Sequence, residues 1–139
     1  MADGEVVAKM LAAARAAMTK AYAPYSNFPV GAALLGANGK IYAGCNVENA
    51  AYPQGCCAET SAISAMIADG EREIRAALVV GQGRELIAPC GGCRQRLNEF
   101  ATSSTPVHLS GSKGVERTVT LGELLPFAFG PQNLAGSGS

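Results

Sequence analysis

The segment IRAALVVG, at residues 74–81, constrains the fold of this chain more than any other. Its apolar residues run on without the alternation of a half-exposed strand, which predicts a strand buried on both faces. Such a strand needs helices packed on each side of its sheet. Segments 57–70 and 90–100 flank it and carry helical patterns, so we expect an α/β fold with helices on both faces of the sheet.

The N-terminal part of the chain predicts a helix followed by a hairpin. Apolar residues at helical spacing favour a helix over 5–21, and the two prolines of PYSNFP, at 24–29, prevent it from continuing. Two strand-like segments, 30–35 and 41–47, flank a turn rich in glycine and asparagine. This part of the chain therefore contributes one helix and two paired strands.

The C-terminal part predicts a further strand over 105–110 and a last short helix over 121–129. The length of 139 residues suits one domain, 1–139, with one substantial core. The end of the chain is rich in glycine and serine, so we expect a flexible tail over about 131–139.

Charge and hydropathy exclude several classes of function. Eleven basic residues balance eleven acidic ones, which leaves no broad positive surface for nucleic acid or for anionic membranes. No apolar run approaches the roughly 20 residues that cross a bilayer. The N-terminus lacks the basic start, apolar centre and cleavage site of a secretory signal, so we expect a cytoplasmic protein.

The cysteines point to chemistry. Five cysteines, an odd number, argue against a fully paired disulfide framework. Cys57 stands two residues before Glu59 at the start of one predicted helix, and Cys90 and Cys93 lie one turn apart at the start of another. Three thiolates at two helix ends can supply three of the four tetrahedral positions of zinc, leaving one open as in catalytic sites.

The open position would hold a water that the metal makes nucleophilic, and Glu59 is placed to move its proton. Alone, the C-x-x-C pair could equally be a redox motif or a structural zinc site. Together with C-x-E and Pro89, it forms the zinc-deaminase motif in a three-cysteine version.

Three other candidate ligands are expected to have packing roles. Cys45 ends a predicted strand, and Cys56 neighbours a ligand but cannot easily aim at the same ion. His108 is the only histidine and lies within a predicted strand, where a packed position is more common than a ligand.

Several longer motifs then resemble one known family over nearly the whole chain. PYSNFPVGAALL, GCNVENAAY, CAE, PCGGCRQ and ELLPFAFGP stand in the order seen in cytidine deaminases of the small homotetrameric class. The resemblance implies hydrolysis of cytidine and 2′-deoxycytidine to uridine and 2′-deoxyuridine with release of ammonia, as in pyrimidine salvage. It also implies a mixed sheet of five strands, a homotetramer and one zinc ion per subunit.

The resemblance also assigns residues. It makes Cys57, Cys90 and Cys93 the zinc ligands and Glu59 the proton shuttle. Substrate would be bound by the ribose-binding pair Asn46 and Glu48, by Phe28 as a wall of the base pocket, by the backbone around Ala58, and by Tyr52 and Phe129 near subunit boundaries. Without the motif, Asn46 and Glu48 could form an exposed turn and Phe129 could be plain core.

One position departs from the family pattern. Many relatives carry an arginine directly after Cys-Ala-Glu, where this chain has Thr60. Three thiolates leave a zinc site with one net negative charge, so its compensation would rest on Arg94 and the helix ends, or on a positive group from elsewhere.

The sequence leaves two other interpretations of the function open. One is a deaminase of a related aminopyrimidine or nucleoside antibiotic, and the other is a non-catalytic zinc- or thiol-based binding module. Glu59 favours an enzyme over the binding module, since a structural zinc site has no use for a buried carboxylate.

Overall fold

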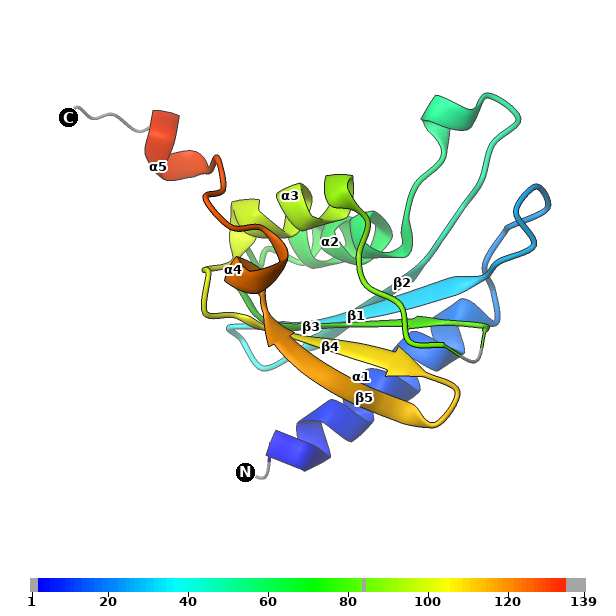
Figure 1. Cartoon of the computed structure of the whole chain (residues 1–139), viewed down its shortest axis with the longest axis horizontal. Helices are drawn as coiled ribbons and strands as arrows, with labels where there is room; N and C mark the ends of the chain where they lie inside the picture. The colour runs from blue at the N-terminus through cyan, green and yellow to red at the C-terminus, as the bar shows by residue number, and fades with distance from the viewer. Residues whose placement is uncertain (1–2, 84, 135–139) are drawn as a thin grey trace.

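The protein is built around one mixed sheet, seen here in a computed structural model that describes residues 3–83 and 85–134 (Figure 1). The sheet has five strands in the order β2-β1-β3-β4-β5, and β3 and β4 are its parallel pair. The strands are β1 (Val30–Gly36), β2 (Ile41–Cys45), β3 (Ile74–Gly81), β4 (Pro106–Gly111) and β5 (Gly114–Thr120). The predicted α/β class and five-stranded mixed sheet are confirmed.

Helices cover both faces of the sheet, as the apolar sequence of β3 predicted. Helix α1 (Asp3–Met18) lies on one face, and α2 (Ala58–Ala68) and α3 (Gly91–Phe100) lie on the other (Figure 1). Three short helices complete the fold: η1 (Tyr52–Gln54), α4 (Leu121–Leu124) and α5 (Pro131–Leu134). No helix in the described residues is long and apolar enough to cross a membrane.

The two faces of the sheet carry separate core clusters. Along β3, Ala77 and Val79 pack toward α2, while Ala76, Leu78 and Val80 pack toward α1. Successive side chains of a strand point to opposite faces, so a strand covered on both sides is apolar at successive positions, as β3 is from Ala76 to Val80; Arg75, near its start, is exposed. Burial of one large aliphatic side chain stabilises such a fold by about 2 kcal/mol.

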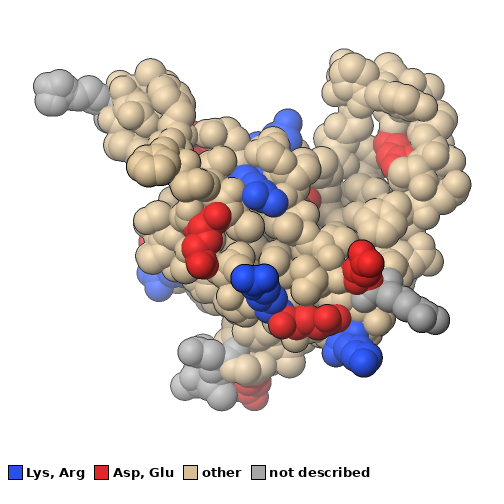
Figure 2. All heavy atoms as spheres, viewed as in Figure 1, with Lys and Arg blue, Asp and Glu red and all other residues tan. Residues whose placement is uncertain are grey.

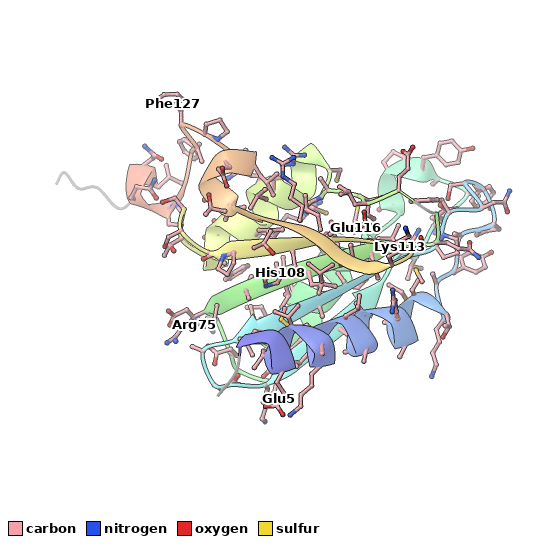
Figure 3. The ribbon with its side chains drawn as sticks, turned by 60° about the horizontal axis from the view of Figure 1, so that its bottom comes forward. Glu5, Arg75, His108, Lys113, Glu116 and Phe127 are labelled. Atoms are coloured by element: carbon pink, nitrogen blue, oxygen red, sulfur yellow. The ribbon has the colours of Figure 1, made fainter. Side chains whose placement is uncertain are left out.

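His108 has the packed position expected from the sequence (Figure 3). Val107 and Leu109 belong to the cluster under α2, so His108 alternates onto the α1 face of β4, where it lines a hollow with Met10. Its Nδ1 atom lies 2.8 Å from Oγ1 of Thr118, and burial lowers the pKa of the imidazole. It therefore lies on the opposite side of the sheet from α2 and α3.

The C-terminal third differs most from the sequence-based expectation. The helix predicted over 121–129 ends at Leu124, since Pro126 cannot continue it. Strand β5 was not located from the sequence, because Glu116, Arg117 and Thr118 are exposed at this edge of the sheet and give it no apolar pattern. Within the predicted tail, residues 131–134 form α5, and the rest lies outside the described residues.

Helix α2 approaches strand β2 unusually closely at Gly44. A Cβ atom at this position would lie 2.5 Å from the backbone N of Ala62 and 2.7 Å from the carbonyl O of Ala58. No side chain fits in that space, so glycine is required for α2 to lie at this depth on the sheet. The start of α2, with Cys57 and Glu59, is placed by this contact.

We therefore predict that Gly44→Ala displaces the start of α2. The expected loss of stability is roughly 1–3 kcal/mol, because the backbone of α2 must move to admit the methyl group. Thermal or urea unfolding measures the loss, and zinc content measures the displacement. Gly4→Ala is the matched control: a Cβ atom there meets nothing within 4 Å, so this variant should keep or slightly gain stability. Equal behaviour of the two variants would contradict the role given to Gly44.

Candidate metal centre and active site

Three thiols converge where α2 and α3 begin. Cys57 and Cys90 are the N-cap residues of α2 and α3, both with extended backbones, and Cys93 lies in the first turn of α3. The sulfurs of all three lie within 4.8 Å of one another, and those of Cys57 and Cys90 are 3.8 Å apart. In the described residues this is the one group of three or more His, Cys, Asp or Glu side chains close enough to hold a metal ion.

The spacing of the sulfurs fits zinc. Tetrahedral coordination with Zn–S bonds of about 2.3 Å places two sulfur ligands about 3.8 Å apart. The separation between Cys57 and Cys90 matches this value. Sulfur is a soft donor that zinc binds well, whereas the hard cations calcium and magnesium prefer oxygen ligands.

The electrostatic environment of the three thiols favours a bound cation. Burial raises the pKa of the Cys57 thiol, and burial with the nearby Glu59 carboxylate raises that of Cys93. At Cys90, burial also acts to raise the pKa, but hydrogen bonds from the Cys93 backbone N–H and from the neighbouring thiols outweigh it, so the pKa is lowered. Three thiolates need positive charge at this place, and a divalent metal ion provides it.

Glu59 stands beside the thiols on the first turn of α2. It is only 5% exposed, and this burial raises the pKa of its carboxyl group. A hydrogen bond with its own backbone, one with Cys93 and the charge of Arg96 act in the opposite direction. A raised pKa makes a carboxylate a better proton acceptor, which suits a group that carries protons.

One cavity of about 330 Å³ joins Glu59 to several residues that the sequence assigned to substrate binding. Its walls are formed by Ser26, Phe28, Val30, Asn46, Cys57, Ala58, Glu59, Ile87, Ala88 and Cys90. The cavity thus brings together a carboxyl group, two candidate metal ligands, an aromatic ring and an amide.

Comparison with known protein families identifies the family of this chain. Residues 5–109 match the family described as the cytidine and deoxycytidylate deaminase zinc-binding region. The chain belongs to this family.

Individual members resemble the chain over most of its length. A curated cytidine deaminase of Sporosarcina psychrophila is 45% identical over 129 residues, covering 93% of this chain and 95% of that protein. The crystal structure of cytidine deaminase from Burkholderia pseudomallei superposes with a TM-score of 0.83 at 45% identity, over 93% of this chain and 100% of that one. The structure from Mycobacterium tuberculosis gives 0.79 at 36% identity, over 94% and 99%.

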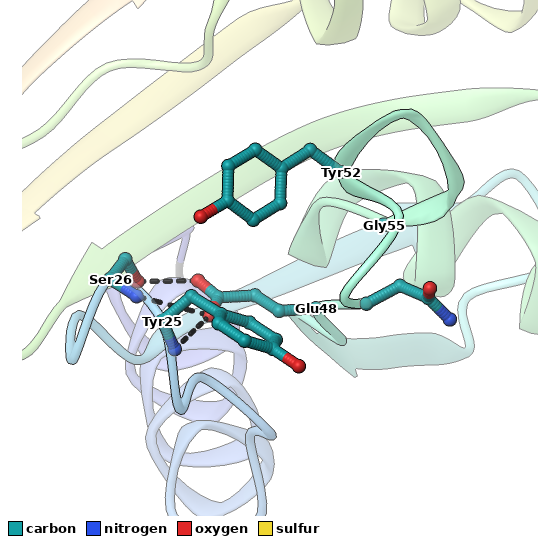
Figure 4. Close-up of a pocket in the computed structure, with 6 residues that line it drawn as sticks. Tyr25, Ser26, Glu48, Tyr52 and Gly55 are labelled. Carbon is teal, nitrogen blue, oxygen red and sulfur yellow. Dashed lines mark hydrogen bonds between the residues drawn. The ribbon is translucent and has the colours of Figure 1, made fainter.

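Not every residue assigned from the sequence lines this deaminase-family cavity. Glu48 lines a neighbouring hollow with Tyr25 and Tyr52, and Ser26 belongs to both (Figure 4). Tyr52 is 74% exposed, and its ring meets that of Tyr25 edge to face at 5.9 Å. Phe129 is 57% exposed and contacts α3 through its carbonyl oxygen, which accepts hydrogen bonds from Gln95 and Asn98.

The two arginines of α3 have different surroundings. Arg94 donates from Nε to the carbonyl of Pro89 at 2.7 Å and from a terminal nitrogen to that of Leu124 at 3.0 Å. Arg96 lies near Gly92 in the first turn of α3 and lines a hollow with Thr60. Its charge acts on Glu59, which makes Arg96 a positive group near the site that the sequence analysis did not identify.

The sequence analysis also missed four residues that line the cavity: Ser26, Val30, Ile87 and Ala88. Ile87 and Ala88 directly precede Pro89 and Cys90, so their closeness to the ligand motif was the available signal. Ser26 lies inside the quoted motif PYSNFP, two residues before Phe28. Its position in that motif was the available signal.

We predict that zinc binding needs the cysteines of the sulfur cluster and not the other cysteines of the chain. Cys57→Ala should lose most of its zinc, because two remaining thiols cannot hold the ion as tightly. Cys56→Ala is the matched control: Cys56 is exposed and adjacent in sequence but not in the sulfur cluster. Zinc per chain, measured by elemental analysis on reduced protein, should be close to wild type for the control. Equal zinc in the two variants would refute the assignment.

Proposed function

We propose that this protein is a zinc-dependent aminohydrolase that converts cytidine and 2′-deoxycytidine to uridine and 2′-deoxyuridine with release of ammonia, a step of pyrimidine salvage. One observation carries the proposal: a buried carboxyl group, Glu59, shares a cavity with converging thiols and with Phe28 and Asn46. The names of the relatives, cytidine deaminases, supply the substrate class.

In this proposal Cys57, Cys90 and Cys93 hold zinc. The bound metal supplies Lewis acidity that activates water for attack on the ring. The chain contributes negative ligands at two helix N-termini, whose dipoles favour anions. Arg96 and Arg94 add positive charge. Arg94 is held near the ligands by its hydrogen bond to the carbonyl of Pro89, directly before Cys90.

Glu59 is the proton carrier of the proposed reaction. It takes a proton from the attacking water and gives it to N3 of the pyrimidine. It then carries the second proton of that water to the 4-amino group, which leaves as ammonia while C4 gains a carbonyl oxygen. One water is consumed and one ammonia released, and Glu59 ends in its starting state.

Substrate recognition is divided between the cavity and the neighbouring hollow that Glu48 lines. Phe28 presents an aromatic ring to the base, and the backbone at Ala58, the first residue of α2, faces the polar edge of the base. Asn46 and Glu48 offer an amide and a carboxylate to the sugar hydroxyls. The substrate is uncharged, in keeping with a net charge of zero and with charges of both signs dispersed over the face in Figure 2.

We place Tyr52 and Phe129 at contacts between subunits of a homotetramer. Both are large, aromatic and more than half exposed in the single chain. Phe127, two residues before Phe129, is fully exposed, and aromatic side chains are enriched at protein interfaces. We also place the protein in the cytoplasm, where a reducing environment keeps free thiols available for metal.

The direct test is the change in ultraviolet absorbance of cytidine and of 2′-deoxycytidine mixed with the zinc-loaded protein, with the zinc determined on the same sample. Conversion to the uridines with about one zinc per chain supports the proposal. Zinc present with neither nucleoside consumed would refute cytidine and direct the search to another aminopyrimidine. Absence of zinc from freshly reduced protein would refute the site itself.

Glu59→Gln separates the shuttle from the metal site. We predict that it lowers kcat at least about a hundredfold, because an amide cannot carry the proton, and that zinc content is unchanged. Glu116→Gln, an exposed glutamate on β5, is the control and should match wild type in both measurements. If Glu59→Gln lost zinc and folded structure together, the residue would have a structural role instead.

A further inference from the structure

The loop that carries Phe28 is fastened to Glu48 by three hydrogen bonds (Figure 4). The Oε1 atom of Glu48 accepts from the backbone N–H groups of Tyr25, at 2.9 Å, and Ser26, at 3.1 Å. Its Oε2 atom accepts from the hydroxyl of Ser26. The bond from Ser26 is the main reason that the pKa of Glu48 lies below its ordinary value. The carboxylate therefore stays ionised and is oriented by the loop.

The hydroxyl of Ser26 extends this connection to Phe28. While it donates to Glu48, it accepts a hydrogen bond from the backbone N–H of Phe28 at 3.1 Å. A hydroxyl has one hydrogen and two lone pairs, so the two bonds are compatible. Ser26 is thus the link between the Glu48 carboxylate and the backbone of Phe28.

Asn46 fixes the other side of Phe28. Its side-chain Nδ2 donates to the carbonyl of Phe28 at 3.1 Å, and its Oδ1 accepts from the N–H of Val30 at 2.8 Å. The amide therefore spans Pro29, which has no N–H of its own. Both backbone polar groups of Phe28 are bonded to side chains, its N–H to Ser26 and its C=O to Asn46.

The ring of Phe28 is fixed from a third direction, the end of β3. A Cβ atom at Gly81 would lie 2.8 Å from Cζ of Phe28, and one at Gly83 would lie 3.5 Å from Cε1. Asn27, directly before Phe28, has a φ of 56°, in the left-handed region that asparagine adopts more readily than most residues other than glycine. Its N–H donates to the carbonyl of Ala23 at 2.9 Å, which closes the turn before Phe28.

We infer that Ser26 is a positioning residue, whose hydroxyl couples the sugar-binding carboxylate of Glu48 to the aromatic wall that Phe28 presents to the base. This rests on the proposed function for its substrate. In this arrangement Asn46 and Glu48 serve two purposes, since they hold the Phe28 loop as well as meeting the sugar. A change at Ser26 should then impair recognition of the base and not only of the hydroxyls.

The first test compares Ser26→Ala with Ser26→Thr in zinc-loaded protein. Ser26→Ala removes both hydroxyl bonds, and we expect kcat/KM for cytidine to fall about tenfold, the effect of roughly 1.4 kcal/mol. Ser26→Thr keeps a hydroxyl and should recover most of the loss. Ser104→Ala is the control, because it removes an exposed serine hydroxyl bonded to Thr102, far along the chain from the site. An unchanged kcat/KM for Ser26→Ala would overturn the inference.

The deciding test asks whether Ser26 acts through Phe28. When the ring is removed by Phe28→Ala, adding Ser26→Ala should cost little more, because the group that it positions is already gone. If Ser26→Ala still costs about tenfold in that background, Ser26 acts on the sugar through Glu48 alone and the inference is wrong.

A third measurement is independent of the reaction. In zinc-loaded, substrate-free protein, the amides of Tyr25, Ser26 and Phe28 should exchange their hydrogens faster in Ser26→Ala than in wild type and in Ser104→Ala. Failure of cytidine turnover with this exchange pattern intact would refute the proposed substrate and leave the loop coupling standing. Unchanged exchange would refute the coupling itself.

Discussion

The site depends on bringing the N-termini of two helices together at one end of the sheet. Helix α3 is the crossover between the parallel strands β3 and β4, and it begins after the loop that leaves the end of β3. Helix α2 reaches the same place from strand β2, and it lies deep enough only because residue 44 has no side chain. Cys57 and Cys90 can then be the N-caps of two helices and still have sulfurs 3.8 Å apart. Neither helix alone could assemble the cluster.

The convergence of the two helix N-termini also brings several acidic groups close together, and these groups need positive charge nearby when they ionise. Burial raises the pKa of Glu59, Cys57 and Cys93, so the folded chain disfavours collecting negative charge there. Thr60 contributes no charge at the position where the family resemblance implies arginine, and its hydroxyl lies 3.9 Å from the Cys93 sulfur. Arg96, on the facing helix, lines the same hollow and acts on Glu59. Positive charge at this site therefore comes from α3 instead of α2.

The sequence was informative where a local pattern determines the structure. The apolar residues 76–80 of β3 and the spacing of cysteines at two helix starts were enough to place the core and the thiols. Patterns failed for β5, whose exposed polar residues occupy a sheet edge, and for residues 125–129, where Pro126 ended the predicted helix. The bonds from Tyr25 and Ser26 to Glu48 join positions more than 20 residues apart, and no periodicity records such a contact.

The two halves of the cavity are made rigid in different ways. The thiols and Glu59 stand on helix ends, whose backbones are held by regular hydrogen bonds within the helices and by packing on the sheet. Phe28, in contrast, lies on a loop outside regular secondary structure. Its N–H and C=O are bonded to the side chains of Ser26 and Asn46, and Glu48 accepts from the N–H groups of Tyr25 and Ser26. Polar groups used in this way cannot be varied independently for ligand binding, because each change also releases the backbone that it holds. Residues that would contact a sugar are therefore, in this fold, also part of the support for the base.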